Sequence, residues 1–574
     1  MPGPPSRHDR LAAETGGWRK KWTGLLPVAL VFPNLYRVGM SNLGFQLVYD
    51  LVNSQPELVC ERVFLPETPG RPLSVESNRP LRDFPLILCS LSFEEDYLNL
   101  IRMLDAGGIE PLAENRRTAD PFREPGRPLL VGGGVATFIN PEPLAPFFDL
   151  LVIGEAEAAL PPVLAALLAA GGRLDRPAFL RSLAASSPGC YAPQLYSCEY
   201  GPQGELLGIT APSDLPARVR KVTGPKPAVA GHSRVLTPEA EFADLFLAEL
   251  GRGCSRGCRF CAAGFVYRPP RLWEVAAIKA ALAARPQAVR RIGLLGMEMA
   301  RRADLAALSD YLLGEECALS FSSLRADAIS PELLRLLAAS GLKSAAIAPD
   351  GGSERLRRVI NKGLTEEDLL RAAEALAEVG IANLKLYCMI GLPTEEDEDL
   401  LELVALARRI KDKVMTVGRR RGRVADLTLS VNCLVPKAWT PFQFYGMPPV
   451  LELKRKLKLV RKGLAGEPNI RIQAEPPEKA LLQAVLARGD RRLGAALPAV
   501  VRSEKNWRQA MKDEGLDPGF YANRGRGEQE RFPWEIVDHG LDRGYLWREY
   551  QRALAARATP PCEIERCRRC GVCG

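Results

Sequence analysis

The sequence predicts an α/β protein with two parallel-sheet units in series, followed by a mainly helical region and a cysteine-rich tail. Short apolar runs alternate with helical patterns over two separate stretches, and repeated β–α alternation is typical of parallel sheets. At 574 residues the chain is too long for one hydrophobic core, so several domains are expected. A hydrophobic content of 47% with 25% charged residues is that of a folded, water-soluble protein.

The first unit is expected over residues 25–230, after a flexible N-terminus at 1–24. Its apolar, β-branched runs are too short for helices and predict buried strands at 26–32, 59–65, 86–91, 129–131 and 150–153. Helical spacing lies between them at 42–53, 97–106 and 155–170. Such alternation predicts a doubly wound sheet, in which ligands bind beyond the carboxyl ends of the strands.

The second unit is expected over residues 231–448. Strands are predicted at 245–249, 292–295, 318–321, 344–348, 384–389 and 427–431, with helices at 273–284, 304–313, 331–339, 366–379 and 396–410. Because these strands lack an alternating polar face, six strand–helix units predict a curved parallel sheet, a partial (β/α)6 barrel. Catalytic groups collect at the carboxyl ends of barrel strands.

The last third is expected to be helical over residues 449–558. Helical patterns fall at 451–464, 478–488, 490–499, 506–514 and 545–556, with acids and bases interleaved as on solvated helix faces. The remaining residues, 559–574, form the cysteine-rich tail.

Three cysteines stand close together after the first predicted barrel strand: Cys254, Cys258 and Cys261. Their spacing, C-x3-C-x2-C, lets three thiolates hold three irons of a 4Fe-4S cube and leaves the fourth iron open to a small molecule. A zinc knuckle would need a fourth ligand, and zinc ligands usually come in two separated pairs. Seven cysteines are scattered along the chain, and most of these lie in apolar runs, a pattern that suits a reducing cytosol rather than a disulfide framework.

This cysteine motif, placed after the first strand of a six-unit partial barrel, resembles that of the radical S-adenosylmethionine (SAM) superfamily. The resemblance implies that the 4Fe-4S cluster binds SAM and reductively cleaves it to a 5′-deoxyadenosyl radical. It further implies SAM contacts from residues at the barrel's strand ends and in the cysteine motif: Phe260 near adenine, Gly296 with Glu298 near the amino group, Ser323, Asp350 on the ribose hydroxyls, and Met389. Ordinary turns and strand ends would explain several of these residues equally well.

The first unit resembles cobalamin-binding domains, which have a flavodoxin-like fold. Their motifs Asp-x-His-x-x-Gly, Ser-x-Leu and Gly-Gly correspond to segments 39–44, 90–92 and 132–133. Ser41 stands where that family has its cobalt-binding histidine, and serine is a poor cobalt ligand. The unit therefore either holds cobalamin without a protein ligand or has kept the fold and lost the cofactor. The candidate contacts are Ser41, Gly44, Ser90, Gly132 and Gly133.

The tail carries four more cysteines, Cys562, Cys567, Cys570 and Cys573, with the spacing C-x4-C-x2-C-x2-C. Four ligands in one short run could complete a second iron–sulfur cluster with no open iron. A zinc site is the next alternative, and a redox-reactive or disordered tail is the third.

The whole pattern resembles radical SAM proteins with a cobalamin-binding-like domain, which implies a radical modification, such as methylation, of a substrate that the sequence does not identify. A reductant such as flavodoxin or ferredoxin is implied as a partner. The net charge of +9 allows a nucleic-acid partner but supports it weakly, so a tRNA methylthiotransferase-like enzyme is one alternative. A non-catalytic iron–sulfur electron-transfer protein is another. With neither a signal-peptide pattern nor an unbroken apolar span, a cytoplasmic location without membrane contact is expected.

Overall fold

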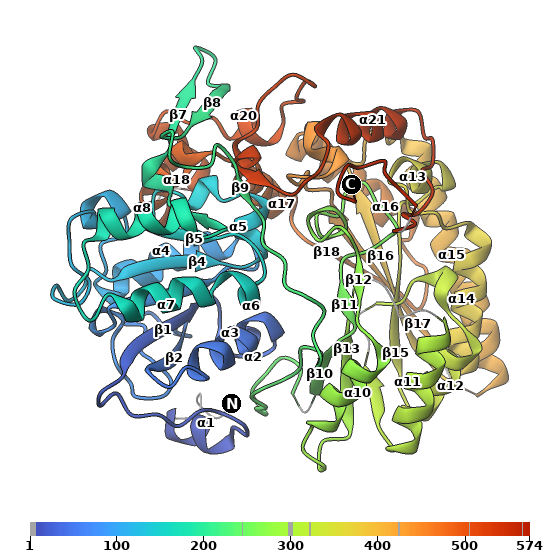
Figure 1. The fold of residues 1–574 in the computed structure, drawn as a ribbon. Coiled ribbons are helices and arrows are strands. Elements are labelled where there is room, and N and C mark those ends of the chain that lie inside the picture. The colour runs from blue at the N-terminus through green and yellow to red at the C-terminus, as the bar shows by residue number, and fades with distance from the viewer. Residues whose placement is uncertain are drawn as a thin grey trace.

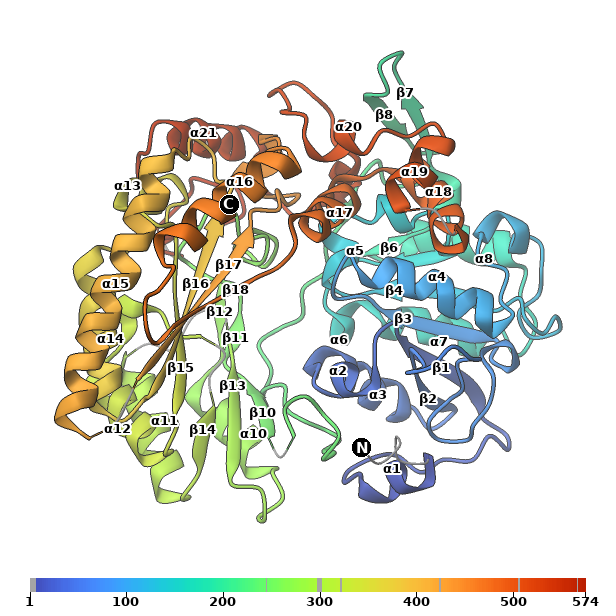
Figure 2. The same ribbon diagram turned by 180° about the vertical axis from the view of Figure 1, so that it is seen from behind.

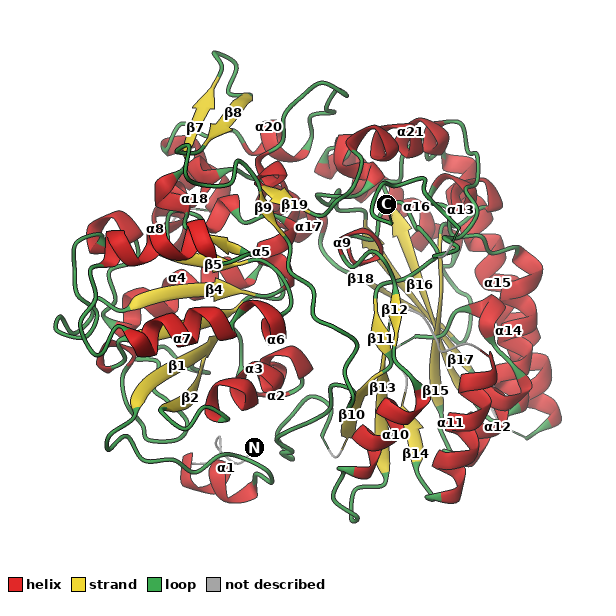
Figure 3. Ribbon diagram, in the orientation of Figure 1, coloured by secondary structure: helices red, strands yellow, loops and turns green. Residues whose placement is uncertain are grey.

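The computed structural model describes residues 7–243, 245–296, 302–320, 323–422, 425–503, 506–564 and 566–573. Two α/β units lie side by side, and the C-terminal segments run across the top of both (Figure 1). We call residues 25–222 the N-terminal unit and residues 245–474 the barrel unit. Figure 3 shows that both units have strands inside and helices outside.

The N-terminal unit is built on one sheet with the strand order β2-β1-β3-β4-β5-β6. The first five strands are parallel and β6 is antiparallel to β5. The order 2-1-3-4-5 is that of flavodoxin-like doubly wound sheets, as predicted. The strands are β1 (Leu26–Phe32), β2 (Leu58–Phe64), β3 (Leu86–Ser90), β4 (Leu129–Gly133), β5 (Leu150–Val152) and β6 (Cys190–Tyr191).

Helices cover both faces of this sheet, which explains why its strands are buried and mostly apolar; the buried Glu61 and Arg62 of β2 are the charged exceptions. Helix α7 lies in front of the sheet in Figure 1, and α4 lies in front of it in the reverse view of Figure 2. The helices are α2 (Tyr36–Met40), α3 (Leu43–Asn53), α4 (Asp96–Gly107), α5 (Val135–Ile139), α6 (Ala156–Ala159), α7 (Pro161–Ala169) and α8 (Arg176–Ser186). A hairpin of β7 (Ser197–Tyr200) and β8 (Leu206–Thr210) extends beyond the unit.

The barrel unit is a curved parallel sheet in two sections, β10-β13-β14 and β15-β16-β17-β18. A parallel bridge between Leu324 and Ile347 joins the two sections. The strands are β10 (Leu245–Glu249), β13 (Arg291–Leu295), β14 (Ala318–Ser320), β15 (Ser344–Asp350), β16 (Asn383–Ile390), β17 (Asp426–Cys433) and β18 (Ile470–Ala474). The outer helices are α10 (Val275–Ala283), α11 (Arg302–Gly314), α12 (Pro331–Ala339), α13 (Glu354–Val359), α14 (Glu366–Glu378) and α15 (Asp397–Arg420).

Strand β18 adds a parallel strand outside β17, in a stretch for which only helices were predicted. Its partly buried Ile470, Ile472 and Ala474 alternate with the exposed Arg471 and Gln473. Five alternating residues are too few to stand out between two long helical patterns, and an edge strand needs only one apolar face.

Residues 7–24, predicted to be flexible, are packed against the N-terminal unit. Helix α1 (Arg7–Ala13) is followed by a backbone bridge from Thr15 to Leu236. Between them, the buried carboxylate of Glu14 accepts two hydrogen bonds from the guanidinium of Arg62, at 2.7 and 2.9 Å. Because a buried charge is costly unless it is paired, this pair ties the segment to the sheet.

The C-terminal segments join the two units. Helix α18 (Arg491–Arg502) packs on α4, and the short β19 (Val537–Asp538) pairs with β9 (Val219–Arg220). The Lys437 ammonium lies 2.5 Å from the buried carboxylate of Glu94, which also accepts a hydrogen bond from Gln483. The other helices here are α16 (Val450–Gly463), α17 (Pro477–Arg488), α19 (Trp507–Asp513), α20 (Pro518–Ala522) and α21 (Arg543–Leu554).

Within the described ranges, every helix is too short or too polar to cross a lipid bilayer.

Candidate active site

The three predicted cluster ligands lie on a loop at the carboxyl end of β10, which we call the cluster loop (residues 253–262). Its base is closed by the antiparallel pair β11 (Gly251–Arg252) and β12 (Arg271–Leu272), with the short α9 (Ala263–Val266) between. Gly253 has φ +93°, and a Cβ there would lie 2.5 Å from the carbonyl oxygen of Tyr267. Glycine is therefore required where the loop folds back on itself.

The donor set of the cluster loop fits an iron–sulfur cluster. Burial, together with repulsion from the neighbouring thiolates of Cys258 and Cys254, raises the pKa of the Cys261 thiol to about 11. A cationic iron core would remove that repulsion, as metals do for coordinating thiols. No three His, Cys, Asp or Glu side chains in the described part of the chain are already gathered around a metal-sized space.

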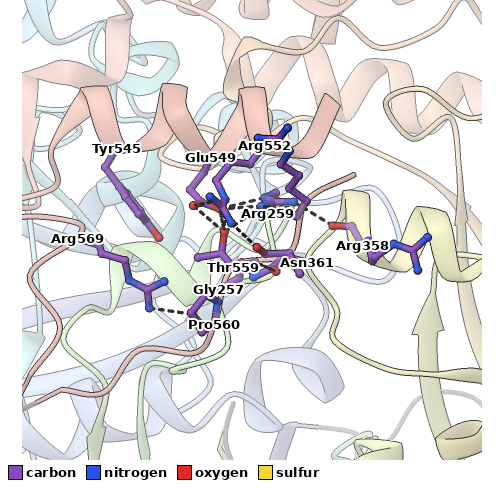
Figure 4. Close-up of polar contacts among 12 residues, drawn as sticks. Gly257, Arg259, Arg358, Asn361, Tyr545, Glu549, Arg552, Thr559, Pro560 and Arg569 are labelled. Carbon is purple, nitrogen blue, oxygen red and sulfur yellow. Dashed lines mark hydrogen bonds and ion pairs between the residues drawn. The ribbon is translucent and has the colours of Figure 1, made fainter. Parts of the chain in front are cut away.

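Arg259 anchors the cluster loop from within. Its guanidinium is fully buried and donates to the carboxylate of Glu549 at 3.0 and 3.1 Å and to the hydroxyl of Thr559 at 3.1 Å. We call these three residues the Arg259 clamp. The same guanidinium donates to backbone carbonyls of Arg358, Val359 and Arg557. Figure 4 shows α21 presenting Glu549 from one side and the end of α13 presenting Arg358 from the other.

Asn361 and Lys362 lie beside the cluster loop and were not predicted as site residues. The Asn361 amide donates to the carbonyl of Gly257 at 3.2 Å and accepts from the backbone N–H of Thr559 at 2.8 Å. The Lys362 ammonium lies 2.5 Å from the carboxylate of Asp350. Burial raises the pKa of Cys258, and the charge of Lys362 opposes that shift, so this lysine lies within electrostatic reach of a predicted ligand. The Asn-Lys-Gly sequence after α13 is a turn pattern, which hid both roles.

The predicted SAM residues occupy different surroundings. Phe260 and Met389 pack against one apolar cluster around Leu356 and Phe442. Asp350 ends β15 and is paired with Lys362. Ser323 is exposed. Gly296 lies on a different side, in the wall of a cavity, and Glu298 lies outside the described residues.

That cavity has a volume of about 500 Å³ and lies between the two units. The N-terminal unit supplies strand ends and α3, and the barrel unit supplies Glu249, Gly251, Arg252, Tyr267, Leu295 and Gly296. We call it the interunit cavity. Four of the five predicted cobalamin contacts line it: Gly44, Ser90, Gly132 and Gly133.

Ser41, the fifth predicted contact, does not line the interunit cavity. It follows α2 as its C-terminal cap, donates to the carbonyl of Arg37 at 2.8 Å and accepts from the N–H of Phe242 at 3.2 Å. Its neighbour Asn42 faces the cavity instead, donating to Ser92 at 3.0 Å and capping α3 through the N–H of Phe45. The sequence motif places both residues in one turn, but only the backbone direction decides which side chain faces the cavity.

Charged side chains from both units meet at the edge of the interunit cavity. Arg252 lies within 2.7 to 3.1 Å of the carboxylates of Glu155, Glu157 and Glu249. Burial opposes its charge, but hydrogen bonds to Glu157 and Glu249 outweigh burial and hold the pKa of Arg252 above its usual value. Arg271 also contacts Glu155. The network fixes the two units relative to each other at the cavity.

The cysteine-rich tail touches the cluster loop at Cys562. The backbone N–H of Cys562 donates to the carbonyl of Ser255 at 2.7 Å. The Arg569 guanidinium donates to the thiol of Cys567 at 3.2 Å, and Cys570 is buried. Described residues 559–564 and 566–573, which we call the cysteine tail, are thus packed on the protein rather than extended into solvent.

Two family models and one curated relative match parts of this chain. The family described as "Radical SAM superfamily" matches residues 248–407, and the one described as "Radical SAM proteins, N-terminal" matches residues 44–193. An uncharacterized protein of Methanocaldococcus jannaschii, MJ0966, is 28% identical over 475 residues, which are 82% of this chain and 90% of that protein.

Two solved structures resemble the chain at low sequence identity. One is the radical SAM methyltransferase TsrM from Kitasatospora setae with cobalamin and a [4Fe-4S] cluster bound; it has a TM-score of 0.48 and 14% identity over 86% of this chain and 99% of that one. The other is the cobalamin-dependent radical SAM enzyme OxsB, with a TM-score of 0.44 and 16% identity over 76% of this chain and 56% of that one.

Proposed function

We propose that this protein performs a radical modification, with methylation as the leading candidate, on a substrate held in the interunit cavity; the match of residues 248–407 to the radical SAM superfamily supports this proposal. Its 4Fe-4S cluster would be held by Cys254, Cys258 and Cys261. When bound, this cluster supplies the electron that cleaves SAM to methionine and a 5′-deoxyadenosyl radical.

One observation carries the proposal: strand ends of both sheets line the same cavity. Gly296, at the end of β13, lines the interunit cavity together with Gly44 and Gly133 of the N-terminal unit. A molecule bound there is covered by both units, which keeps water from a reactive intermediate. Substrate and cofactor sites typically combine apolar walls with a few polar groups, and this cavity has that character.

The residues beside the cluster loop suit SAM as a ligand. The Lys362 ammonium can bind the carboxylate of SAM, and the Asp350 carboxylate can accept hydrogen bonds from its amino group or ribose hydroxyls. In the ligand-free protein the two charges satisfy each other. Phe260 and Met389, on their shared apolar cluster, offer a surface for the adenine ring.

Cobalamin fits the N-terminal side of the interunit cavity. Gly133 faces open space, since the atom nearest to a Cβ built there is the carbonyl oxygen of Val152 at 3.8 Å. The cavity wall there is glycine, serine and aliphatic side chains, so its polar contacts would come from the backbone, Asn42 and Ser90. When bound, cobalamin would supply a methyl group for transfer. With Ser41 turned away and no histidine lining the cavity, the cobalt would have no imidazole ligand from the described residues.

Anaerobic reconstitution with iron and sulfide, followed by SAM and dithionite, tests the first step. Wild-type protein should release 5′-deoxyadenosine, while Cys254→Ala should release none. Cys433→Ala, a cysteine at the end of β17 and away from both cysteine motifs, is the matched control and should retain activity. An intact cluster without any 5′-deoxyadenosine would favour a purely electron-transferring protein instead.

Binding of hydroxocobalamin, followed by visible absorption after gel filtration, tests the second cofactor. Retained absorption at one cobalamin per chain supports methyl transfer as the reaction class. Colourless protein at saturating cobalamin would reject cobalamin as a cofactor and would not affect the proposed SAM cleavage.

A further inference from the structure

The cysteine tail and the cluster loop share a boundary. The hydrogen bond from the Cys562 N–H to the Ser255 carbonyl is 2.7 Å long, and Ser255 directly follows Cys254. Summing the intervening bonds puts the α-carbons of Cys254 and Cys562 within roughly 10 Å of each other. Two sets of metal-binding thiols therefore begin at adjacent points of the structure, although more than half of the chain separates them in the sequence.

The tail is folded by contacts that do not involve its thiols. Arg569 donates to the carbonyls of Pro560 and Pro561, at 2.8 Å each, and the Thr559 N–H donates to Asn361 at 2.8 Å. Thr559 is also part of the Arg259 clamp. A structural zinc usually supplies the folding free energy of a segment that cannot fold alone. Here other contacts already hold the segment, so a structural metal has little left to stabilise.

Basic side chains surround the tail thiols. Arg569 donates to the Cys567 thiol, and the guanidinium of Arg268 neighbours Cys570. Hydrogen bonds to cluster sulfurs, together with net charge and solvent exposure, set the reduction potential of an iron–sulfur cluster. Four ligands in one run also leave no iron open, which suits electron transfer rather than substrate binding.

We propose that Cys562, Cys567, Cys570 and Cys573 hold a second 4Fe-4S cluster that passes single electrons from a donor protein to the cluster on Cys254, Cys258 and Cys261. The inference rests on the proposed function, because the electron is consumed only by SAM cleavage. The donor loses one electron and the tail site takes it up and passes it on. SAM gains it as its C5′–S bond breaks to methionine and the 5′-deoxyadenosyl radical. No proton moves in this step.

The surface over the tail indicates the charge of the donor. Arg566, Arg568 and Arg569 are exposed, whereas Cys562, Cys567 and Cys573 are half-buried beneath them. A basic surface over a shallow redox site favours an acidic electron carrier, with charge steering the encounter. An acidic flavodoxin or ferredoxin is the probe to use.

The double variant Cys567→Ser/Cys570→Ser tests the site. Metal analysis of anaerobic protein should fall from about eight to about four irons per chain, with no zinc gained, since each cubane holds four irons. Mössbauer and EPR spectra should keep the signal of the SAM-binding cluster and lose a second one. Cys433→Ala is the control and should keep both signals. Zinc in the wild-type tail, or one cubane in both proteins, would overturn the proposal.

Two reductants test the transfer itself. With reduced flavodoxin, 5′-deoxyadenosine formation by the double variant should drop at least about tenfold, whereas with dithionite, which reaches both sites, it should stay within about twofold. Equal loss with both reductants would contradict the relay. A wild-type protein that is inactive with dithionite would instead contradict the proposed function.

A second variant leaves all cysteines in place. Arg566→Glu/Arg568→Glu should keep both clusters and the dithionite rate but slow reduction of the SAM-binding cluster by flavodoxin, followed by stopped-flow absorbance. An unchanged flavodoxin rate at low ionic strength would place donor binding elsewhere and refute entry through the tail.

Discussion

The carboxyl ends of the two parallel sheets of this protein carry different kinds of side chain. The barrel unit ends in thiols and buried charges, with Lys362 and Asp350 beside Cys258. The N-terminal unit ends in glycine and serine, and its contribution to the interunit cavity is mostly backbone and aliphatic side chains. In the proposed function, the first edge carries the chemistry and the second holds a large, weakly charged molecule. A doubly wound sheet and a barrel can share one reaction because both bind ligands at the carboxyl ends of their strands.

The largest effect is expected from a variant of the cluster loop in the barrel unit. Replacing Cys258 with alanine removes one of three ligands from the cluster loop, and a cubane that opens to SAM cannot be held by two thiolates. 5′-Deoxyadenosine should become undetectable, and iron should fall by about four per chain. Cobalamin binding should be unchanged, since Cys258 does not line the interunit cavity. Loss of cobalamin binding in this variant would mean that the two sites depend on each other.

Arg259→Leu should give the next largest effect. It leaves the buried Glu549 with only the more distant guanidinium of Arg552, at 3.7 Å, and removing one member of a buried ion pair costs about 3–5 kcal/mol of unfolding free energy. Urea denaturation of apo protein measures the loss, and cluster retention on gel filtration measures the position of the loop. Arg259→Leu combined with Glu549→Leu should recover part of the stability but not cluster retention. Full recovery of both would reduce the Arg259 clamp to a purely stabilising contact.

A third variant tests cobalamin binding by the N-terminal unit. Gly133→Val adds a side chain that the local packing tolerates but that should occupy the interunit cavity. Cobalamin affinity should fall about tenfold or more, which is about 1.4 kcal/mol. Uncoupled SAM cleavage should change little. Gly70→Val, at an exposed position with the nearest atom 3.7 Å from a Cβ, is the matched control. A parallel loss of SAM cleavage would show that the two sheet edges are not separable.

The smallest effect is expected at the ion pair between Glu94 of the N-terminal unit and Lys437 of the barrel unit. Burial opposes the charge of Glu94, but Lys437 outweighs burial and holds the pKa of Glu94 below its usual value. A lowered carboxyl pKa stabilises the fold above the unfolded pKa of about 4.3, and this contribution is lost as pH falls through the folded value. Glu94→Gln should remove about 1 kcal/mol at pH 7 and flatten the acid side of the stability–pH curve. Unfolding by urea between pH 3 and 7 measures both, and an unchanged curve would contradict the assignment.

Many strands of the two units could be predicted from local sequence patterns. The apolar runs that form β1, β10 and β16 are short and follow β–α order, so periodicity alone locates them. The place of Cys254, Cys258 and Cys261 on one loop after the first barrel strand was predictable from the strand pattern, and their role as cluster ligands stays a prediction. Strand β18 was missed because its alternation is brief and half exposed.

The contacts that organise the site were not predictable in the same way. Arg259 could be noticed as an arginine between two ligands, but Glu549 and Thr559 lie nearly 300 residues away and nothing local marks them. Lys362 was not predicted because it lies in a turn, and its ion pair with Asp350 is a tertiary contact without a local sequence signal. Ser41 was predicted as a cobalamin contact from its place in a motif. In the structure its hydroxyl donates to the carbonyl of Arg37 and does not line the interunit cavity. Pairings that depend on tertiary contact leave no periodic signal in the sequence.

The Arg259 clamp has a consequence for biosynthesis. Glu549 lies 290 residues after Arg259, and translation at about 5–20 residues per second takes roughly 15–60 s to cover that interval. During that time a nascent chain exposes Cys254, Cys258 and Cys261 without the helix that locks their loop in place. Iron should therefore be inserted after release from the ribosome, and ribosome-bound chains stalled before residue 549 should incorporate none.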